Sequence, residues 1–180
     1  MKIFDEKFKE IFASQVVSVV GGLIAGIFLV IYLDKLLLIP GMFILLPGFL
    51  EMRGNISGSM AVRLTSGMFL GFIKPNKIKT KVVKHNVFSS FILAIIISLF
   101  LGLLAFIFTF LVFDVSLPKI ILIPLIAGII ANAVEIPLTL FFTFYFFRKS
   151  YDPNDIIGPF VSSTGDIISI LSLLLVVMLI

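Results

Sequence analysis

The stretch LLPGFLEMRGNISGSMAVRL, Leu45–Leu64, mixes apolar residues with side chains that a lipid bilayer disfavours. Its polar members include Glu51, Arg53, Asn55 and Arg63. A charged side chain at the bilayer centre costs roughly 2.5–3.5 kcal/mol on insertion scales. That cost applies to this stretch only if the rest of the chain places it inside a membrane.

Composition places the chain in a membrane. Of its 180 residues, 60% are apolar and 13% are charged, and the mean hydropathy of +1.24 is too high for a water-soluble surface. The apolar residues form five long blocks at roughly 14–33, 36–73, 86–113, 118–147 and 156–180. These blocks are too long for the alternating strands of a barrel. The sequence therefore predicts an all-α integral membrane protein with five transmembrane helices.

The block at 36–73 is unusually long. As a single helix it would extend about 57 Å, nearly twice the hydrocarbon thickness of about 30 Å. Helix-breaking residues occur within it at Pro40-Gly41, Pro47-Gly48 and Gly54. Asn55 or Ser57 is a suitable cap for a new helix starting there. Because broken backbone at membrane depth must be buried in protein or line a wet cavity, we expect a broken second helix that does not face lipid.

The N-terminal segment MKIFDEKFKEIF places Phe4, Phe8 and Phe12 on one helical face and mixes charges between them. This pattern suits a short amphipathic helix in the membrane interface. We assign this helix to residues 1–13 and a transmembrane domain to residues 14–180. The alternative is a solvated lead-in to the first span, and neither interpretation gives the segment a chemical role.

Basic residues gather in alternate connections between the blocks. The segment 74–84 carries five lysines, and the last connection carries Arg148 and Lys149, whereas the other two connections hold one lysine each. The positive-inside rule puts the lysine-rich connections and the N-terminus in the cytoplasm and the C-terminus outside. The sequence thus predicts a multi-pass protein of the cell (plasma) membrane, in contact with lipid, and no nucleic-acid partner is expected.

Five ionisable residues lie within the blocks: Glu51, Arg53, Arg63, Glu135 and Asp166. Each needs a partner or a wet environment. We expect the two arginines to pair with Glu51 or Glu135 inside the bundle, with a direct role in transport as the alternative. The chain has no cysteine and one histidine, so any bound cation must rely on oxygen ligands rather than the nitrogen and sulfur that zinc or copper prefers.

Asp166 differs from the other four because of its depth and its neighbours. It lies about 15 Å along the fifth block, near the membrane midplane. Ser162 and Ser169 share its helical face, and that block contains no basic residue. A carboxylate in this setting is a cation site by default, and an interhelical pair with Arg53 or Arg63 is the alternative.

Two motifs resemble the transmembrane domain of MgtE-type magnesium channels and the MgtE-like solute carriers of animals. The first is Arg53-Gly54-Asn55, followed by Arg63 and Gly71. The second is Asp152-Pro153 followed by GPFVSSTGD at 158–166. The resemblance extends over residues 14–180, with both motifs in the expected spans and order.

The resemblance implies a homodimer of five-helix domains in which the second and fifth helices line an ion path. The family aspartate that binds magnesium corresponds to Asp166, and the family's glycine-asparagine pair corresponds to Gly54 and Asn55. Mg²⁺ is then the transported and bound ion, held by Asp166 with Ser162 and Asn55. Manganese, cobalt and calcium stay open as alternatives.

The chain also departs from the bacterial pattern. Bacterial members have a second glycine where this chain has Arg53, and they carry cytosolic regulatory domains. We expect a standalone transmembrane domain here, acting as a channel or as a coupled carrier. Two other classes stay open: a membrane-embedded enzyme that acts on lipids with Glu51, Glu135 and Asp166 as acid–base groups, although no nucleophile is paired with a base, and a structural or accessory subunit in which the charges only pair.

Overall fold

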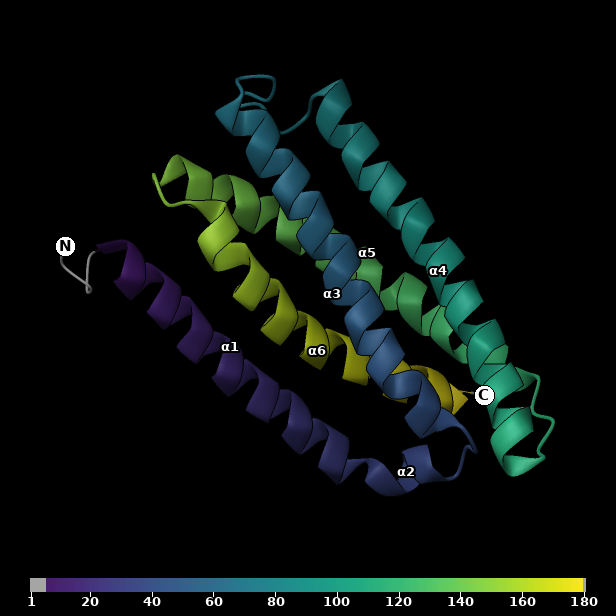
Figure 1. The fold of residues 1–180 in the computed structure, drawn as a ribbon. Coiled ribbons are helices and arrows are strands. Elements are labelled where there is room, and N and C mark those ends of the chain that lie inside the picture. The colour runs from purple at the N-terminus through teal and green to yellow at the C-terminus, as the bar shows by residue number, and fades with distance from the viewer. Residues whose placement is uncertain (1–5, 180) are drawn as a thin grey trace.

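The computed structural model describes residues 6–179, with side chains from Lys7 onward, and all regular structure in this part of the chain is helical (Figure 1). The helices are α1 (Glu6–Ile31), α2 (Leu33–Leu37), α3 (Met42–Phe69), α4 (Lys81–Phe113), α5 (Lys119–Arg148) and α6 (Pro153–Leu179). Four segments are long and apolar enough to cross a membrane: Lys7–Ile31, Lys81–Phe113, Lys119–Arg148 and Pro153–Leu179. The predicted all-α class is confirmed.

The long helix outside this apolar set is α3. It has 28 residues, a length of about 42 Å that exceeds a hydrocarbon core of about 30 Å. Its charged residues, Glu51, Arg53 and Arg63, lower the hydropathy of every window that could span the membrane. Length therefore allows α3 to cross, and a fifth crossing stays a prediction.

The second apolar block is divided near its beginning rather than in its middle. Residues 38–41 separate α2 from α3, as the Pro40-Gly41 pair predicts. Gly41 takes a left-handed φ of 81°, which L side chains rarely adopt, and a Cβ there would overlap Thr109. From Met42 onward the helix continues through Pro47 and Gly54, so the predicted interruptions at these two positions are wrong.

Helix α3 continues through Pro47 and Gly54 because the local cost of each residue is small compared with the gain from packing. Pro47 removes one backbone hydrogen bond, and Gly54 costs about 1 kcal/mol relative to alanine. Packing of α3 against three other helices outweighs both. The two residues predicted as caps, Asn55 and Ser57, do not begin a new helix. The Asn55 amide donates to Glu51 Oε1, one turn earlier, at 3.0 Å, and Ser57 is buried in the bundle.

The start of the chain also differs from expectation. Residues 6–13 form the first turns of α1, which continues to Ile31, so a separate amphipathic helix at 1–13 is wrong for the described part. No proline or glycine stands between Phe12 and the first span to end the helix. Phe8 and Phe12 do share a face, with ring centroids 6.1 Å apart, whereas Phe4 lies outside the described residues.

Helix α3 packs against the bundle on one side and has an exposed stripe on the other, which includes Glu51, Asn55 and Ser59. It packs against α4, α5 and α6, while α1 packs along α6 and α4 packs along α5 (Figure 1). The main core contains buried side chains from all six helices, among them Leu45, Phe49, Ile123, Ala127 and Leu173. In lipid such packing stabilises through van der Waals contact rather than through removal from water. It holds α3 against α6 and so brings their polar residues together.

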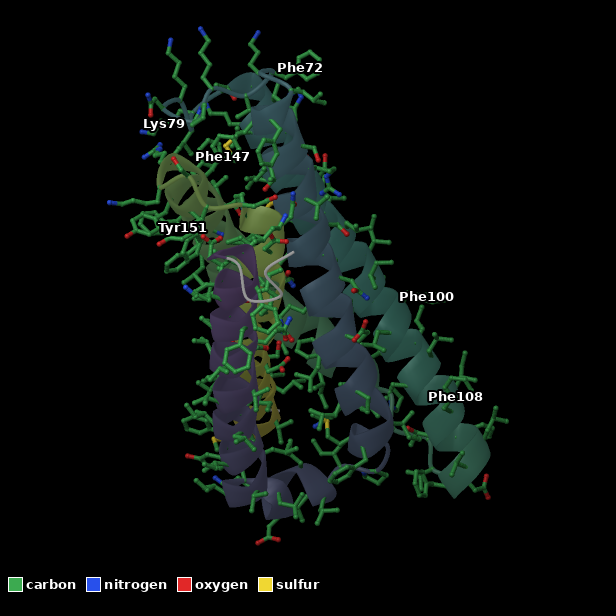
Figure 2. The ribbon with its side chains drawn as sticks, turned by 60° about the vertical axis from the view of Figure 1, so that its left-hand side comes forward. Phe72, Lys79, Phe100, Phe108, Phe147 and Tyr151 are labelled. Carbon is green, nitrogen blue, oxygen red and sulfur yellow. The ribbon has the colours of Figure 1, made fainter. Side chains whose placement is uncertain are left out.

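Basic residues collect at one end of the bundle. Lys7 Nζ lies 3.3 Å from Asp155 Oδ2, which places the start of α1 beside the start of α6. Arg148 Nε donates to the Pro75 carbonyl at 2.8 Å and ties the end of α5 to the loop after α3. Figure 2 shows Lys79 at this same end. The start of α1 and both lysine-rich connections therefore share one end of the molecule.

Apolar side chains cover the outer faces of α1 and α4. Phe100 and Phe108 point away from the bundle on α4 (Figure 2) and are 56% and 48% exposed. Val19, Leu23 and Ile27 are similarly exposed along α1. Such surfaces are unfavourable in water and suit contact with lipid.

Candidate cation site between α3 and α6

A pocket of about 400 Å³ opens between the middle of α3 and the first half of α6. Its walls are formed by Pro47, Leu50, Glu51, Arg53, Gly54, Asn55 and Gly58 of α3 and by Gly158, Ser162 and Asp166 of α6. Three of these are glycines around which a Cβ would meet nothing within 4 Å, namely Gly54, Gly58 and Gly158. The absence of side chains at these positions keeps the pocket open.

Helical spacing turns the polar side chains of both helices toward this pocket. Glu51 and Asn55 are one turn apart on α3, as are Ser162 and Asp166 on α6. Glu51, Asn55 and Ser162 are exposed, and the Asp166 side chain is 29% exposed. The two motifs that the sequence singles out therefore meet in one pocket.

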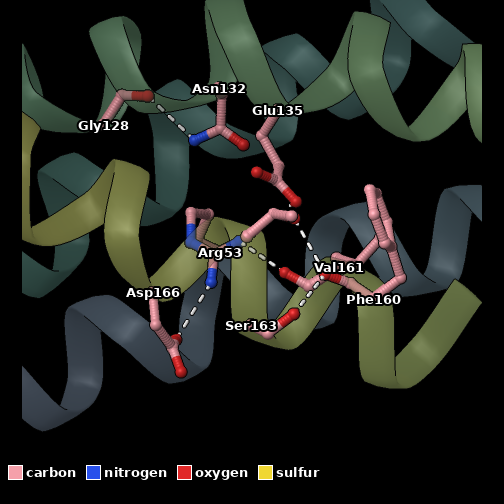
Figure 3. Close-up of polar contacts among 9 residues, drawn as sticks. Arg53, Gly128, Asn132, Glu135, Phe160, Val161, Ser163 and Asp166 are labelled. Atoms are coloured by element: carbon pink, nitrogen blue, oxygen red, sulfur yellow. Dashed lines mark hydrogen bonds and ion pairs between the residues drawn. The ribbon is translucent and has the colours of Figure 1, made fainter. Parts of the chain in front are cut away.

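Arg53 lies behind the pocket, with a completely buried side chain, between Glu135 of α5 and Asp166 of α6 (Figure 3). Its Nη2 donates to Asp166 Oδ1 at 3.2 Å. Its Nη1 donates to the Val161 carbonyl at 3.4 Å and lies 3.4 Å from Glu135 Oε1. Asp166 thus has a counter-charge on another helix. This is the interhelical pair with Arg53 that the sequence leaves open as the alternative to a cation site.

Gly165 makes this arrangement possible. A Cβ at Gly165 would overlap the guanidinium of Arg53, so the arginine reaches Asp166 only because the preceding residue has no side chain. Sequence reasoning did not assign Gly165 a role. The signal is its place directly before Asp166, but only the position of α3 shows which side chain it admits.

The buried cluster contains more acidic than basic side chains. Two carboxylates, Glu135 and Asp166, face the single guanidinium of Arg53. Glu135 is fully buried and does not line the pocket, so Asp166 is the carboxylate of the cluster that reaches it. Glu51 adds a second carboxylate to the pocket wall. Since ionised carboxylates away from bulk water attract cations strongly, the pocket favours a positive ligand.

The remaining predicted residues lie elsewhere. Arg63 Nε donates to Asn86 Oδ1 at 3.0 Å and its Nη2 to Ser90 Oγ at 3.1 Å, so it joins α3 to α4 rather than pairing with a glutamate. Ser169 is buried in the bundle and does not line the pocket. The expected pairing of Arg53 with Glu135 is present, whereas Arg63 has neutral partners.

The pocket offers oxygen ligands of the kind that hard cations prefer. Glu51, Asn55, Ser162 and Asp166 supply carboxylate, amide and hydroxyl oxygens. Among the side chains that the structure describes, from Lys7 to Leu179, no three of His, Cys, Asp or Glu come close enough to hold a metal together. Mg²⁺ keeps several of its waters and needs only one or two carboxylates, so the donor set fits a partly hydrated magnesium ion.

Comparison with known proteins agrees with this chemistry. A family model described as the MgtE divalent cation transporter matches residues 46–176, a range that contains every residue of the pocket. No curated protein matches the chain in a sequence comparison. The family consists of transporters and not of enzymes, so the alternative of a lipid-acting enzyme is set aside. The chain belongs to the MgtE family of divalent cation transporters.

Proposed function

We propose that this protein moves Mg²⁺ across the cell membrane along a path formed by α3 and α6, with Asp166 as the central ligand and Asn55 and Ser162 beside it. The observation that carries this proposal is the mid-helix pocket, which gathers two carboxylates and further oxygen donors. A divalent cation offsets the negative charge there. Its remaining waters fill the rest of the space.

The functional unit is a homodimer. Glu51, Asn55 and Ser59 are exposed along one face of α3, and such polar groups are unfavourable against lipid. A second copy packed on the same face covers them and places two pockets opposite each other across a two-fold axis. The ion path then runs between the copies, in a polar environment. Mass measurement in detergent is the test, and an active monomer would contradict the shared path.

In this proposal α3 is a fifth crossing and the basic end of the bundle lies in the cytoplasm. Cysteines introduced at Asn76 and Tyr151 are then modified by a membrane-impermeant reagent only from the cytoplasmic side. A cysteine at Leu117, in the loop at the opposite end, is modified only from outside. Labelling from the reverse side at any of these positions would contradict the orientation.

Flux into liposomes loaded with a magnesium-sensitive dye tests the role of the pocket. We expect wild-type protein to conduct and Asp166→Asn to lose at least about tenfold in flux, because the variant keeps the shape but removes the charge. Asp114→Asn is the matched control: Asp114 ends α4 in a left-handed conformation that asparagine also adopts, and this variant keeps wild-type flux.

The outcomes separate the remaining alternatives. Wild-type flux through Asp166→Asn means that the path lies elsewhere, and a folded wild-type protein with no flux favours an accessory subunit. Asp166→Glu addresses ion choice, because it displaces the carboxylate by one methylene. Near-octahedral Mg²⁺ tolerates this displacement less than Ca²⁺ does, so the ratio of Ca²⁺ to Mg²⁺ flux rises. An unchanged ratio would remove Asp166 from the determinants of selectivity.

A further inference from the structure

Asp166 is approached from two sides. From the core, Arg53 Nη2 donates to its Oδ1 at 3.2 Å. From the other side the carboxylate borders the pocket, to which 29% of its side chain is exposed. A guanidinium and a cation in the pocket therefore act on the same carboxylate, and two positive charges close together repel.

Glu135 offers Arg53 a second acceptor. Its Oε1 lies 3.4 Å from Arg53 Nη1, yet neither carboxylate oxygen accepts a hydrogen bond from any described residue. The side chain is fully buried, and a buried carboxylate without hydrogen bonds is costly. Glu135 thus gains stability from any shift of the guanidinium toward it.

We propose that Arg53 is a tethered competitor of the transported cation. In the empty pocket it bonds to Asp166, and when a divalent cation binds Asp166 the guanidinium shifts its hydrogen bonding toward Glu135. Glu135 is a positioning residue: it does not touch the ion but sets how firmly Arg53 holds Asp166. This inference rests on the proposed function of Asp166 as cation ligand.

The competition has a use in transport. Conduction needs a site that is attractive enough for an ion to enter but weak enough for it to leave. A fixed carboxylate pair with no internal cation binds a divalent ion tightly and releases it slowly. A guanidinium that returns to Asp166 lowers the affinity and assists release, without a change in the fold.

The test is the dissociation constant for Mg²⁺, measured by titration of the purified full-length protein in detergent and by the Mg²⁺ dependence of flux. Arg53→Gln removes the competitor and is expected to tighten binding by about tenfold, which corresponds to about 1.4 kcal/mol. Glu135→Gln removes the negative charge of the alternative acceptor and so favours the bond from Arg53 to Asp166, and binding weakens by a similar factor. Loss of a nearby charge alone also gives opposite signs, so the double variant decides. Two independent charge effects would cancel in it, whereas a Glu135 that acts only through Arg53 has no effect once Arg53 is gone.

Further variants keep the test decisive if Arg53→Gln folds poorly. The double variant Arg53→Gln/Glu135→Gln leaves Asp166 as the one charged side chain of the cluster and is expected to bind Mg²⁺ as tightly as Arg53→Gln, whereas wild-type affinity would contradict the competition. Arg53→Lys restores a positive charge and brings affinity back toward wild type. Arg63→Gln, which alters a contact with α4 outside the pocket, is the matched control and leaves affinity unchanged.

Failure of this inference is distinct from failure of the proposed function. If Asp166→Asn binds Mg²⁺ like the wild type, the proposed ligand is wrong. If Asp166→Asn loses binding while the Arg53 and Glu135 variants shift affinity in the same direction, or not at all, Arg53 only holds the bundle together and the competition is refuted.

Discussion

Two ion pairs of nearly equal length connect α6 to other helices. Lys7 and Asp155 join α1 to α6 at 3.3 Å, with side chains 62% and 20% exposed. Arg53 and Asp166 join α3 to α6 at 3.2 Å, with side chains 0% and 29% exposed. The distances are alike, so the environment decides what each pair contributes.

The exposed pair has solvent and salt as competitors, and such pairs contribute about 0–1 kcal/mol. In the buried pair the Arg53 guanidinium is shielded from both, and removing one partner of such a pair leaves an uncompensated charge at a cost of about 3–5 kcal/mol. The buried pair also belongs to a cluster of two acidic side chains around one guanidinium. This difference makes the Arg53 pair relevant to cation binding and leaves the Lys7 pair a minor link at the basic end.

The largest effect is expected when Arg53 is replaced by Met, which has similar length and no charge. Glu135 and Asp166 then face each other without a cation, and the free energy of unfolding falls by about 3–5 kcal/mol. Denaturant unfolding in detergent measures this loss. Arg63→Met is the control, and it costs no more than about 1.5 kcal/mol because its partners on α4 are neutral. Equal losses in the two variants would contradict the distinction between a buried charge cluster and an ordinary contact.

A smaller loss is expected from Gly165→Ala. The new Cβ overlaps the Arg53 guanidinium, so the arginine must move away from Asp166, at a cost of about 1–3 kcal/mol. Gly22→Ala on α1 is the matched control, because a Cβ there meets nothing within 4 Å and alanine favours a helix. Thermal melting compares the two variants. Equal melting temperatures would show that the guanidinium is not held against Gly165.

Two serines on α6 test where the polar pocket ends. Ser162 lines the pocket, whereas Ser169 is buried in the bundle with no hydrogen-bond partner for its hydroxyl among the described residues. Ser162→Ala is expected to raise the Mg²⁺ concentration for half-maximal flux by about threefold, a modest change because water can replace the hydroxyl as a ligand. Ser169→Ala leaves that concentration unchanged. The reverse pattern would move the ion path toward the bundle interior.

The helices could be predicted from the sequence because long apolar runs have few other stable arrangements in lipid. The block at 118–147 corresponds to α5 at Lys119–Arg148, and the block at 86–113 lies within α4. The break at Gly54 was predicted wrongly because glycine weakens a helix only slightly. Packing against three neighbours, which a single stretch does not reveal, decides that α3 continues.

The sequence could identify the polar residues of the site but not which of them pair with one another. Asn55, Ser162 and Asp166 could be chosen because polar groups at membrane depth need a function or a partner. Arg53 and Asp166 are separated by 113 positions, and the sequence alone does not choose among Glu51, Glu135 and Asp166 as partners. That choice depends on the orientation of α3 about its own axis where it packs against α5 and α6, and on the space left by the missing side chain at Gly165.

The smallest effect is expected at the exposed pair. Lys7→Met removes the charge that faces Asp155 but keeps an apolar stem along α1, and the free energy of unfolding changes by less than about 0.5 kcal/mol. Because solvent screens this pair, the difference shrinks further at high salt. A double-mutant cycle with Asp155→Asn, measured at low and high salt, isolates the coupling between the two side chains. A coupling above about 2 kcal/mol that salt does not reduce would show that distance rather than burial governs these pairs, and would remove the basis for distinguishing Arg53 from Lys7.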